Sequence, residues 1–195
     1  MGLHQAGFDV TGVDIEWRAR YPFKFNQADA LTFPLEGYDL IWASPPCQAF
    51  SSATPRANRP NHPDLIEPIR RRLAASGAFY IIENVPNAPV RPDVVLTGVS
   101  FGLKVYRRRH FEINFRAWWP EIPRRVGRAT NPDFVTVAGN GSDGAGPDAW
   151  RDAMGIDWMT RDELAQAIPP VYARFLGRWA MTAINQRRRN ETRKH

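Results

Sequence analysis

The stretch Asp39-Leu40-Ile41-Trp42-Ala43-Ser44-Pro45-Pro46-Cys47-Gln48 decides how the rest of this chain is arranged. Its apolar first half predicts a short buried strand. Pro45 and Pro46 fix φ at two successive positions and remove two backbone N–H donors, so the strand should end there. We therefore expect Cys47 to stand on a stiff loop at the carboxyl end of a strand, where open α/β sheets bind their ligands.

Cys47 is the only cysteine of the chain, and its position allows two interpretations. A lone thiol on a loop at a strand end is a candidate nucleophile. Free cysteine is also among the most buried residue types, so Cys47 is equally interpretable as a small buried hydrophobe. A single cysteine excludes an internal disulfide, which fits a reducing compartment.

The length and composition predict a cytoplasmic protein of one domain, or one domain with a small insert. The chain has 195 residues, of which 43% are hydrophobic, enough to build a core. It contains no run of 18 apolar residues that would span a membrane, and its first residues lack the pattern of a signal peptide. We expect it to act as a monomer.

The positive charge is concentrated at the end of the chain. The net charge is +6, and the last nine residues, 187–195, contribute +4 of it, so the other 186 residues carry only +2. A basic tail suits a polyanion, but it is equally typical of a frayed, solvated terminus. The charge of the tail alone therefore does not establish a nucleic-acid partner.

Two short strands are expected before the cysteine stretch, and each leads to an acid. Residues 1–7 predict the end of a helix closed by Gly7. Residues 8–14 predict a strand that ends in Asp14, and residues 24–28 predict a short strand followed by Asp29.

A helix and a second strong strand are expected after the cysteine stretch. Residues 64–76 carry apolar side chains at four-residue spacing, and Pro68 requires this helix to start near Glu67 or to kink. Residues 78–82 then predict an apolar strand that leads to Glu83. A strand–helix–strand order favours a parallel pair, so Cys47 and Glu83 should meet at one edge of a sheet.

The second half of the chain is less regular. Residues 103–115 predict a hairpin or paired strand, and 116–150 predict an insert with no clear helix and one strand at 134–138. Two helices, separated by Pro169-Pro170, are expected after it at 162–167 and 171–186. This divides the chain into a core, an insert, C-terminal helices and a basic tail, at residues 1–115, 116–150, 151–186 and 187–195.

Three blocks resemble the signatures of the DNA (cytosine-5) methyltransferases, in the order of that family: Pro45-Pro46-Cys47-Gln48, Glu83-Asn84-Val85 and Arg107-Arg108-Arg109-His110-Phe111. Each block is short, but three in order, each at an expected strand end, form a specific signal. Ala6-Gly7-Phe8 with Val13-Asp14 also resembles the strand whose terminal acid holds the ribose of the cofactor. Residues 154–158 and 167–170 are similar to the two C-terminal blocks. The resemblance covers all but about 116–150 and is to compact phage and prophage members.

The resemblance implies a Rossmann-like methyltransferase sheet with helices on both faces, S-adenosylmethionine as cofactor, double-stranded DNA as partner, and no metal. It implies a role in DNA methylation, such as restriction-modification, in a bacterial or phage-infected cell. Cofactor contacts are implied for Asp14, Ile15, Asp29, Ala30 and Pro45. Contacts to the DNA or the target base are implied for Pro46, Gln48, Ser51, Arg56, Arg59, Asn84 and Val85.

Methylation at C5 of cytosine needs particular side chains, because C5 is a poor nucleophile. A thiolate that adds to C6 makes C5 reactive, and Cys47 suits that role. A partly buried carboxyl group can supply a proton at N3, the role that the resemblance implies for Glu83. A guanidinium at O2 offsets developing charge, which the resemblance implies for Arg109 and Arg107. Alternatively, Glu83 caps the next turn, and the arginines are a solvated surface or phosphate contacts.

The target atom lies inside the base stack of a duplex, so the base must be flipped out. The segment 50–63 is rich in Ser, Pro, Asn and Arg, predicts a mobile loop, and matches the family's loop that closes over DNA. Its Arg56 and Arg59 suit phosphate contacts that depend on salt. Recognition of the DNA sequence would fall to residues 116–150.

The sequence departs from the family at two places. The family begins with a strand and a Phe-x-Gly-x-Gly loop around the methionine end of the cofactor, which this sequence does not contain. We expect that the sequence is a shortened form of a longer protein in which Met1 is internal; the alternative is a non-catalytic DNA-binding remnant. Val105 also stands where the family usually carries Gln.

Two other activities are weaker interpretations of the same residues. Methylation of RNA cytosine or uracil would use similar chemistry, but the sequence around Cys47 and Glu83 resembles the enzymes of DNA cytosine. A cysteine hydrolase would need His62 or His110 as its base, and neither has an obvious orienting partner or oxyanion site.

Overall fold

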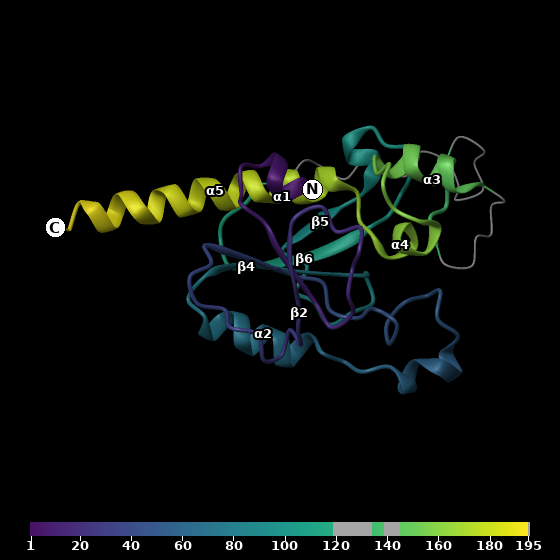
Figure 1. Ribbon diagram of the computed structural model, residues 1–195, viewed down its shortest axis with the longest axis horizontal. Helices are drawn as coiled ribbons and strands as arrows, with labels where there is room; N and C mark the ends of the chain where they lie inside the picture. Colours follow the sequence, from purple (N-terminus) through teal and green to yellow (C-terminus); the bar gives the residue numbers. More distant parts are fainter. Residues whose placement is uncertain (119–133, 139–144, 195) are drawn as a thin grey trace.

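The chain forms a mixed α/β fold with two sheets, in which most strands come early and three helices follow one another at the end (Figure 1). The computed structural model describes residues 1–118, 134–138 and 145–194. The first sheet is the parallel pair β1 (Thr11–Asp14) and β2 (Lys24–Gln27). The second has the order β3-β4-β6-β5, made of β3 (Leu40–Ala43), β4 (Phe79–Asn84), β5 (Val94–Leu96) and β6 (Arg109–Ile113).

The parallel pairing of β3 and β4 is confirmed, and helices cover both faces of their sheet. Ala43 lies opposite Ile82, so the two strands end at the same edge. Side chains alternate across β4: Ile82 packs in the core cluster of α2 (Ile66–Ala75), whereas Ile81 packs in that of α5 (Pro170–Thr192). Figure 1 shows α2 and α5 on opposite sides of the strands.

Of the hairpin or paired strand expected over residues 103–115, the paired strand is confirmed at 109–113, and residues 103–108 form no strand. β6 begins at Arg109 and pairs antiparallel with β4 and with β5, so its hairpin partner lies upstream of residue 103. Three residues are too few to show the alternation that predicts a strand, which is why β5 was not anticipated.

The helix and glycine predictions in the first half of the chain are confirmed. α2 begins at Ile66, so Pro68 falls in the first turn, where a backbone N–H has no partner within the helix. Gly77 follows α2 at φ +72°, and Gly7 follows α1 (Gly2–Gln5) at φ +97°. The segment 50–63 is not entirely loop, because it contains the 3₁₀ helix η1 (Arg56–Asn61).

Two predictions for the insert need correction, while most of its residues lie outside the described part of the chain. α3 (Pro147–Met154) crosses the expected boundary at residue 150, because Pro147 starts a helix whose Trp150 and Met154 are buried. Residues 134–138 form no strand; Val135 donates one backbone hydrogen bond to the Lys104 carbonyl, at 2.8 Å.

The C-terminal helices are confirmed, and the last is longer than expected. α4 (Arg161–Gln166) starts at a capping box of Thr160 and Glu163. α5 continues through the expected frayed tail to Thr192, because residues 185–192 contain no glycine or proline and include three Arg, one Gln and one Glu, which favour a helix. Every helix in the described part of the chain is too short or too polar to cross a lipid bilayer.

Candidate functional site

Three side chains that the sequence placed at strand ends come together at the carboxyl edge of the four-stranded sheet. Cys47 follows the end of β3, and Glu83 is the second-last residue of β4. β6 runs antiparallel to β4 and begins at Arg109, so Arg109 lies at the same edge. We call Cys47, Glu83 and Arg109 the strand-end site.

Glu83 and Arg109 form a buried ion pair. The Arg109 Nε lies 3.0 Å from the Glu83 Oε1, and the two side chains are 13% and 9% exposed, respectively. An ionised group in such a place requires a partner, since an unpaired buried charge is strongly unfavourable. Arg109 therefore is not part of a solvated surface, and it holds the Glu83 carboxylate at the edge beside the cysteine loop.

The cysteine loop is fastened to β4 by Asn84. The Asn84 side chain is 1% exposed, and its Nδ2 donates a 2.9 Å hydrogen bond to the carbonyl of the buried Pro45. The Cys47 carbonyl accepts hydrogen bonds from the backbone N–H groups of Phe50 and Ser51, at 3.0 and 2.8 Å. Because both sides of Cys47 are tied down, the loop is stiff, as the two prolines predict.

Cys47 is a free thiol that is partly exposed. This exposure does not support the interpretation of Cys47 as a small buried hydrophobe. Its side chain is among those whose charge acts on the Arg107 guanidinium, together with Glu83 and Arg109, so these four groups share one neighbourhood. The partly accessible sulfur is open to a substrate that approaches this edge of the sheet.

Arg107 has a different position from the one that the sequence suggested. Its φ of +37° places it in the left-handed region and turns its side chain away from the strand direction. The guanidinium donates hydrogen bonds of 2.6 to 2.9 Å to the carbonyls of Val137, Ala165 and Ala167. Burial, followed by the charge of Arg109, lowers the pKa of Arg107 to about 9. These contacts favour a role in positioning over contact with a base.

Tyr172 is a site-supporting residue that sequence reasoning missed. It lies fully buried on α5, and its hydroxyl donates to the Arg107 carbonyl at 3.1 Å. Burial raises the pKa of Tyr172. The signal in the sequence is the spacing of Tyr172, Leu176, Ala180 and Ile184, which puts Tyr172 on the core face of the helix.

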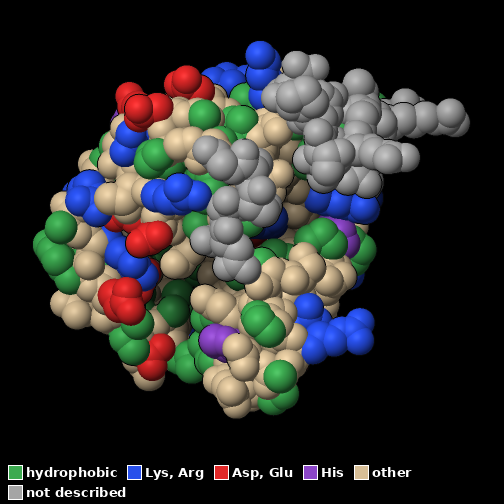
Figure 2. All heavy atoms as spheres, turned by 90° about the vertical axis from the view of Figure 1, so that its right-hand side faces the viewer, with side chains coloured by type: hydrophobic (Ala, Val, Ile, Leu, Met, Phe, Trp, Pro, Cys, Tyr) green, Lys and Arg blue, Asp and Glu red, His purple; other side chains and the backbone are tan. Residues whose placement is uncertain are grey.

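The residues implied in DNA contacts lie on the cysteine loop and after it. Pro46, Gln48 and Arg56 are exposed, whereas Ser51, Arg59 and Val85 are partly buried. The Arg59 Nε donates to the Thr54 carbonyl at 3.2 Å, which ties η1 to the preceding turn. Figure 2 shows the side of the molecule where η1, α3 and α4 lie in Figure 1; Lys and Arg side chains there are mixed with Asp and Glu.

The residues implied in cofactor binding, apart from Pro45, lie at the end of the two strands of the small sheet or just after them. Asp14 ends β1 opposite Gln27 of β2, and Asp29 follows β2 closely, so the two acids come together. Asp14 accepts hydrogen bonds from the Glu16 N–H and the Arg18 Nε, both at 2.9 Å. Asp29 and Ala30 are exposed.

These residues fit the adenosine end of S-adenosylmethionine. Ribose hydroxyl groups are donors, and a carboxylate has about four acceptor positions, of which two on Asp14 are used by Glu16 and Arg18. Ile15, next in the chain, is 69% exposed and offers an apolar surface beside Asp14.

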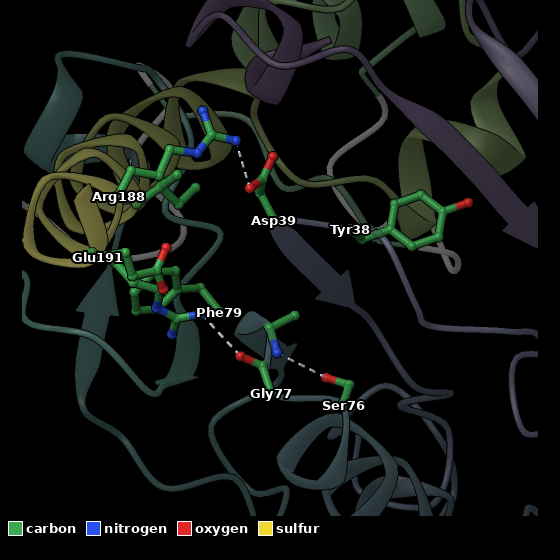
Figure 3. A pocket seen from close by; sticks show the side chains of 10 residues that line it. Tyr38, Asp39, Ser76, Gly77, Phe79, Arg188 and Glu191 are labelled. Atoms are coloured by element: carbon green, nitrogen blue, oxygen red, sulfur yellow. Dashed lines mark hydrogen bonds and ion pairs between the residues drawn. The ribbon is translucent and has the colours of Figure 1, made fainter. Parts of the chain in front are cut away.

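Two hollows in the described part of the chain lie at the opposite edge of the sheet from Cys47. The smaller, of about 220 Å³, lies beside Asp39 and Phe79 (Figure 3). Asp39 directly precedes β3, and Phe79 is the first residue of β4. Within the described ranges, no group of three or more His, Cys, Asp or Glu side chains is placed to hold a metal ion.

Comparison of the chain with protein-family models and with curated proteins gives no match.

Proposed function

We propose that this protein transfers a methyl group from S-adenosylmethionine to C5 of cytosine in double-stranded DNA, through a covalent bond between Cys47 and C6 of a flipped-out base. The observation that carries the proposal is the grouping of a partly exposed thiol with a buried Glu83–Arg109 pair at one sheet edge. We propose in addition that the fold is of the Rossmann-like methyltransferase type and that the protein acts in a bacterial or phage-infected cell.

Each residue of the strand-end site has a distinct task in this reaction. The Cys47 thiolate forms the S–C6 bond, and the π electrons of C5 and C6 move toward C4 and N3. The Glu83 carboxyl group, in its protonated form when the base is bound, donates its proton to N3 and so keeps the adduct from accumulating negative charge, and Arg109 stabilises charge at O2. Water then takes the proton from C5, the electrons of that C–H bond restore the C5–C6 double bond as the Cys47 thiolate leaves, and N3 returns its proton to Glu83.

The cofactor supplies an electrophilic methyl group to C5 when it is bound. Asp14 would accept hydrogen bonds from its ribose, and Ile15 would lie against its adenine. Asp29, Ala30 and Pro45 would complete the site. Arg107 and Tyr172 would act as positioning residues, because they hold the turn that places Arg109 at the sheet edge.

A second candidate is a DNA-binding protein that does not methylate. It is favoured by the ion pair between Asp14 and Arg18, which already uses part of the carboxylate needed by a ribose. Binding of S-adenosylmethionine, measured by titration calorimetry on the whole chain, separates the two candidates: the enzyme binds the cofactor, and the remnant does not.

The decisive experiment measures transfer of tritium from labelled S-adenosylmethionine to unmethylated mixed-sequence duplex DNA, with Cys47→Ala as the matched control. We expect label at C5 of cytosine with the natural chain and none with Cys47→Ala. Label that persists in Cys47→Ala would refute the covalent mechanism. A folded natural chain that binds the cofactor but transfers nothing would refute the activity.

A further inference from the structure

A groove runs along α5 at the edge of the sheet opposite the strand-end site. It encloses about 650 Å³ between one face of α5 and the residues Phe79, Phe115 and Arg116. Phe79 begins β4, whose other end carries Glu83, so the length of a strand separates the groove from the catalytic candidates. Figure 1 shows the carboxyl half of α5 projecting beyond the sheet at this end. We call this feature the α5 groove.

The wall that α5 contributes is polar over most of its length. The residues that line the groove recur every three or four positions from Trp179 to Glu191, which is one face of a helix, and Lys194 continues the row just after the helix ends. No apolar residue occurs after Ile184 in this helix. Beyond Ala183 the groove face of the helix carries only polar and charged side chains, so this part is not built to pack in a core or against an apolar partner. The groove therefore suits a polar or charged ligand.

The lining combines aromatic rings with an excess of positive charge. The rings of Phe79 and Phe115 are 5.9 Å apart and perpendicular, and Trp179 lies partly exposed on the facing helix. Arg116, Arg187 and Lys194 face a single acid, Glu191. Rings that can stack on a base, beside cations that can meet phosphates, are the two features that bind unpaired nucleotides.

Part of the positive charge is held by the protein itself. Arg187 lies over the Phe79 ring at 3.8 Å and donates to the Gly77 carbonyl at 3.0 Å, and Arg188 pairs with Asp39 at 2.7 Å (Figure 3). These contacts fix α5 against the sheet. Arg116 and Lys194 are exposed, which leaves their charges available for a ligand.

We propose that the α5 groove binds single-stranded nucleic acid, with a base against Trp179 and backbone phosphates against Arg116 and Lys194. A duplex hides the faces of its bases, so an aromatic groove selects an unpaired strand. The site is distinct from the strand-end site, and the inference does not depend on methyl transfer.

The test measures fluorescence anisotropy of a labelled 20-nucleotide oligo(dT) with the whole chain. Trp179→Leu, which removes the ring but keeps an apolar side chain, should weaken binding about fivefold or more. The double variant Arg116→Gln/Lys194→Gln should flatten the plot of log affinity against log salt by about 1.4. The matched control, Arg178→Gln/Arg193→Gln, removes two exposed charges outside the groove, one on α5 and one at its C-cap, and should change affinity less.

Equal losses in the two double variants would overturn the proposal, because they would show only general attraction to positive charge. The proposal would also be overturned if the protein bound the oligo(dA)–oligo(dT) duplex as tightly as single-stranded oligo(dT). The same holds if dTMP displaced the oligonucleotide completely and bound as tightly as it does. Circular dichroism checks that Trp179→Leu is folded. If it is not, the comparison of Arg116→Gln/Lys194→Gln with Arg178→Gln/Arg193→Gln tests the proposal. Cys47→Ala should bind the oligonucleotide unchanged, so a failure of the methyl-transfer proposal is recognised separately.

Discussion

At the scale of single residues, the two arginines of one motif have different tasks. Arg109 pairs with Glu83 at 3.0 Å, while Arg107 donates to carbonyls of the insert and of the segment after α4. The left-handed φ of Arg107 gives the two side chains different directions, although the residues are only two positions apart. The sequence presents both as equivalent cations, and only their partners distinguish them.

His110 should make the stability of this protein depend on pH. Its Nε2 is buried without a hydrogen-bond partner in the described part of the chain, and burial, followed by the charge of Arg108, lowers its pKa. Below about pH 6.5 the unfolded chain gains a proton that the folded chain resists, so stability is complete above that pH and falls as the pH decreases.

Urea unfolding between pH 7.5 and 5.5 measures this effect. We expect His110→Phe, which cannot titrate, to lose less stability over that range than the natural chain, and His4→Gln, at an exposed histidine, to behave like the natural chain. The same loss in all three proteins would show that His110 makes no contribution.

At the scale of elements, the turn before β6 depends on a close approach between backbones. Gly98 begins the 3₁₀ helix η2 (Gly98–Phe101), and its N–H donates to the Tyr106 carbonyl at 2.8 Å. A Cβ atom at this position would lie 2.0 Å from the Val105 carbonyl oxygen. The glycine thus allows η2 to lie against the segment that leads to Arg107 and Arg109.

Gly98→Ala should therefore destabilise the protein by about 2 kcal/mol, since the turn must shift to admit a methyl group. Gly146→Ala is the matched control, because a Cβ there has no neighbour within 4 Å. Urea denaturation of both variants checks the difference. A Gly98→Ala protein as stable as Gly146→Ala would mean that η2 and the turn separate at little cost.

At the scale of the whole molecule, the two sheets differ in how well they are protected. β4 pairs with strands on both sides and is buried along most of its length, whereas β1 and β2 form an isolated pair with no buried residue. A two-stranded sheet is only marginally stable by itself. The end of the molecule that carries Asp14 and Asp29 is thus less firmly built than the strand-end site.

Hydrogen exchange followed by mass spectrometry should show this difference. We expect backbone amides in peptides covering residues 11–14 and 24–27 to exchange much faster than those covering 79–84, because local opening requires less free energy where fewer contacts are lost. S-adenosylmethionine, if it binds at Asp14, should slow exchange in β1. Equal protection of β1 and β4 would contradict this account of the fold.

The sequence by itself determined the arrangement around Cys47. Apolar runs ending in proline or in Glu83-Asn84 are local signals, so the parallel β3–β4 pair, the helix between them and the meeting of Cys47 with Glu83 were all predictable. Tertiary structure alone decided the place of β5, the split into two sheets and the separate tasks of Arg107 and Arg109. These features depend on contacts between residues far apart in the chain, such as the hydrogen bond from Arg107 to Ala167, 60 positions later, and no local pattern encodes such a contact.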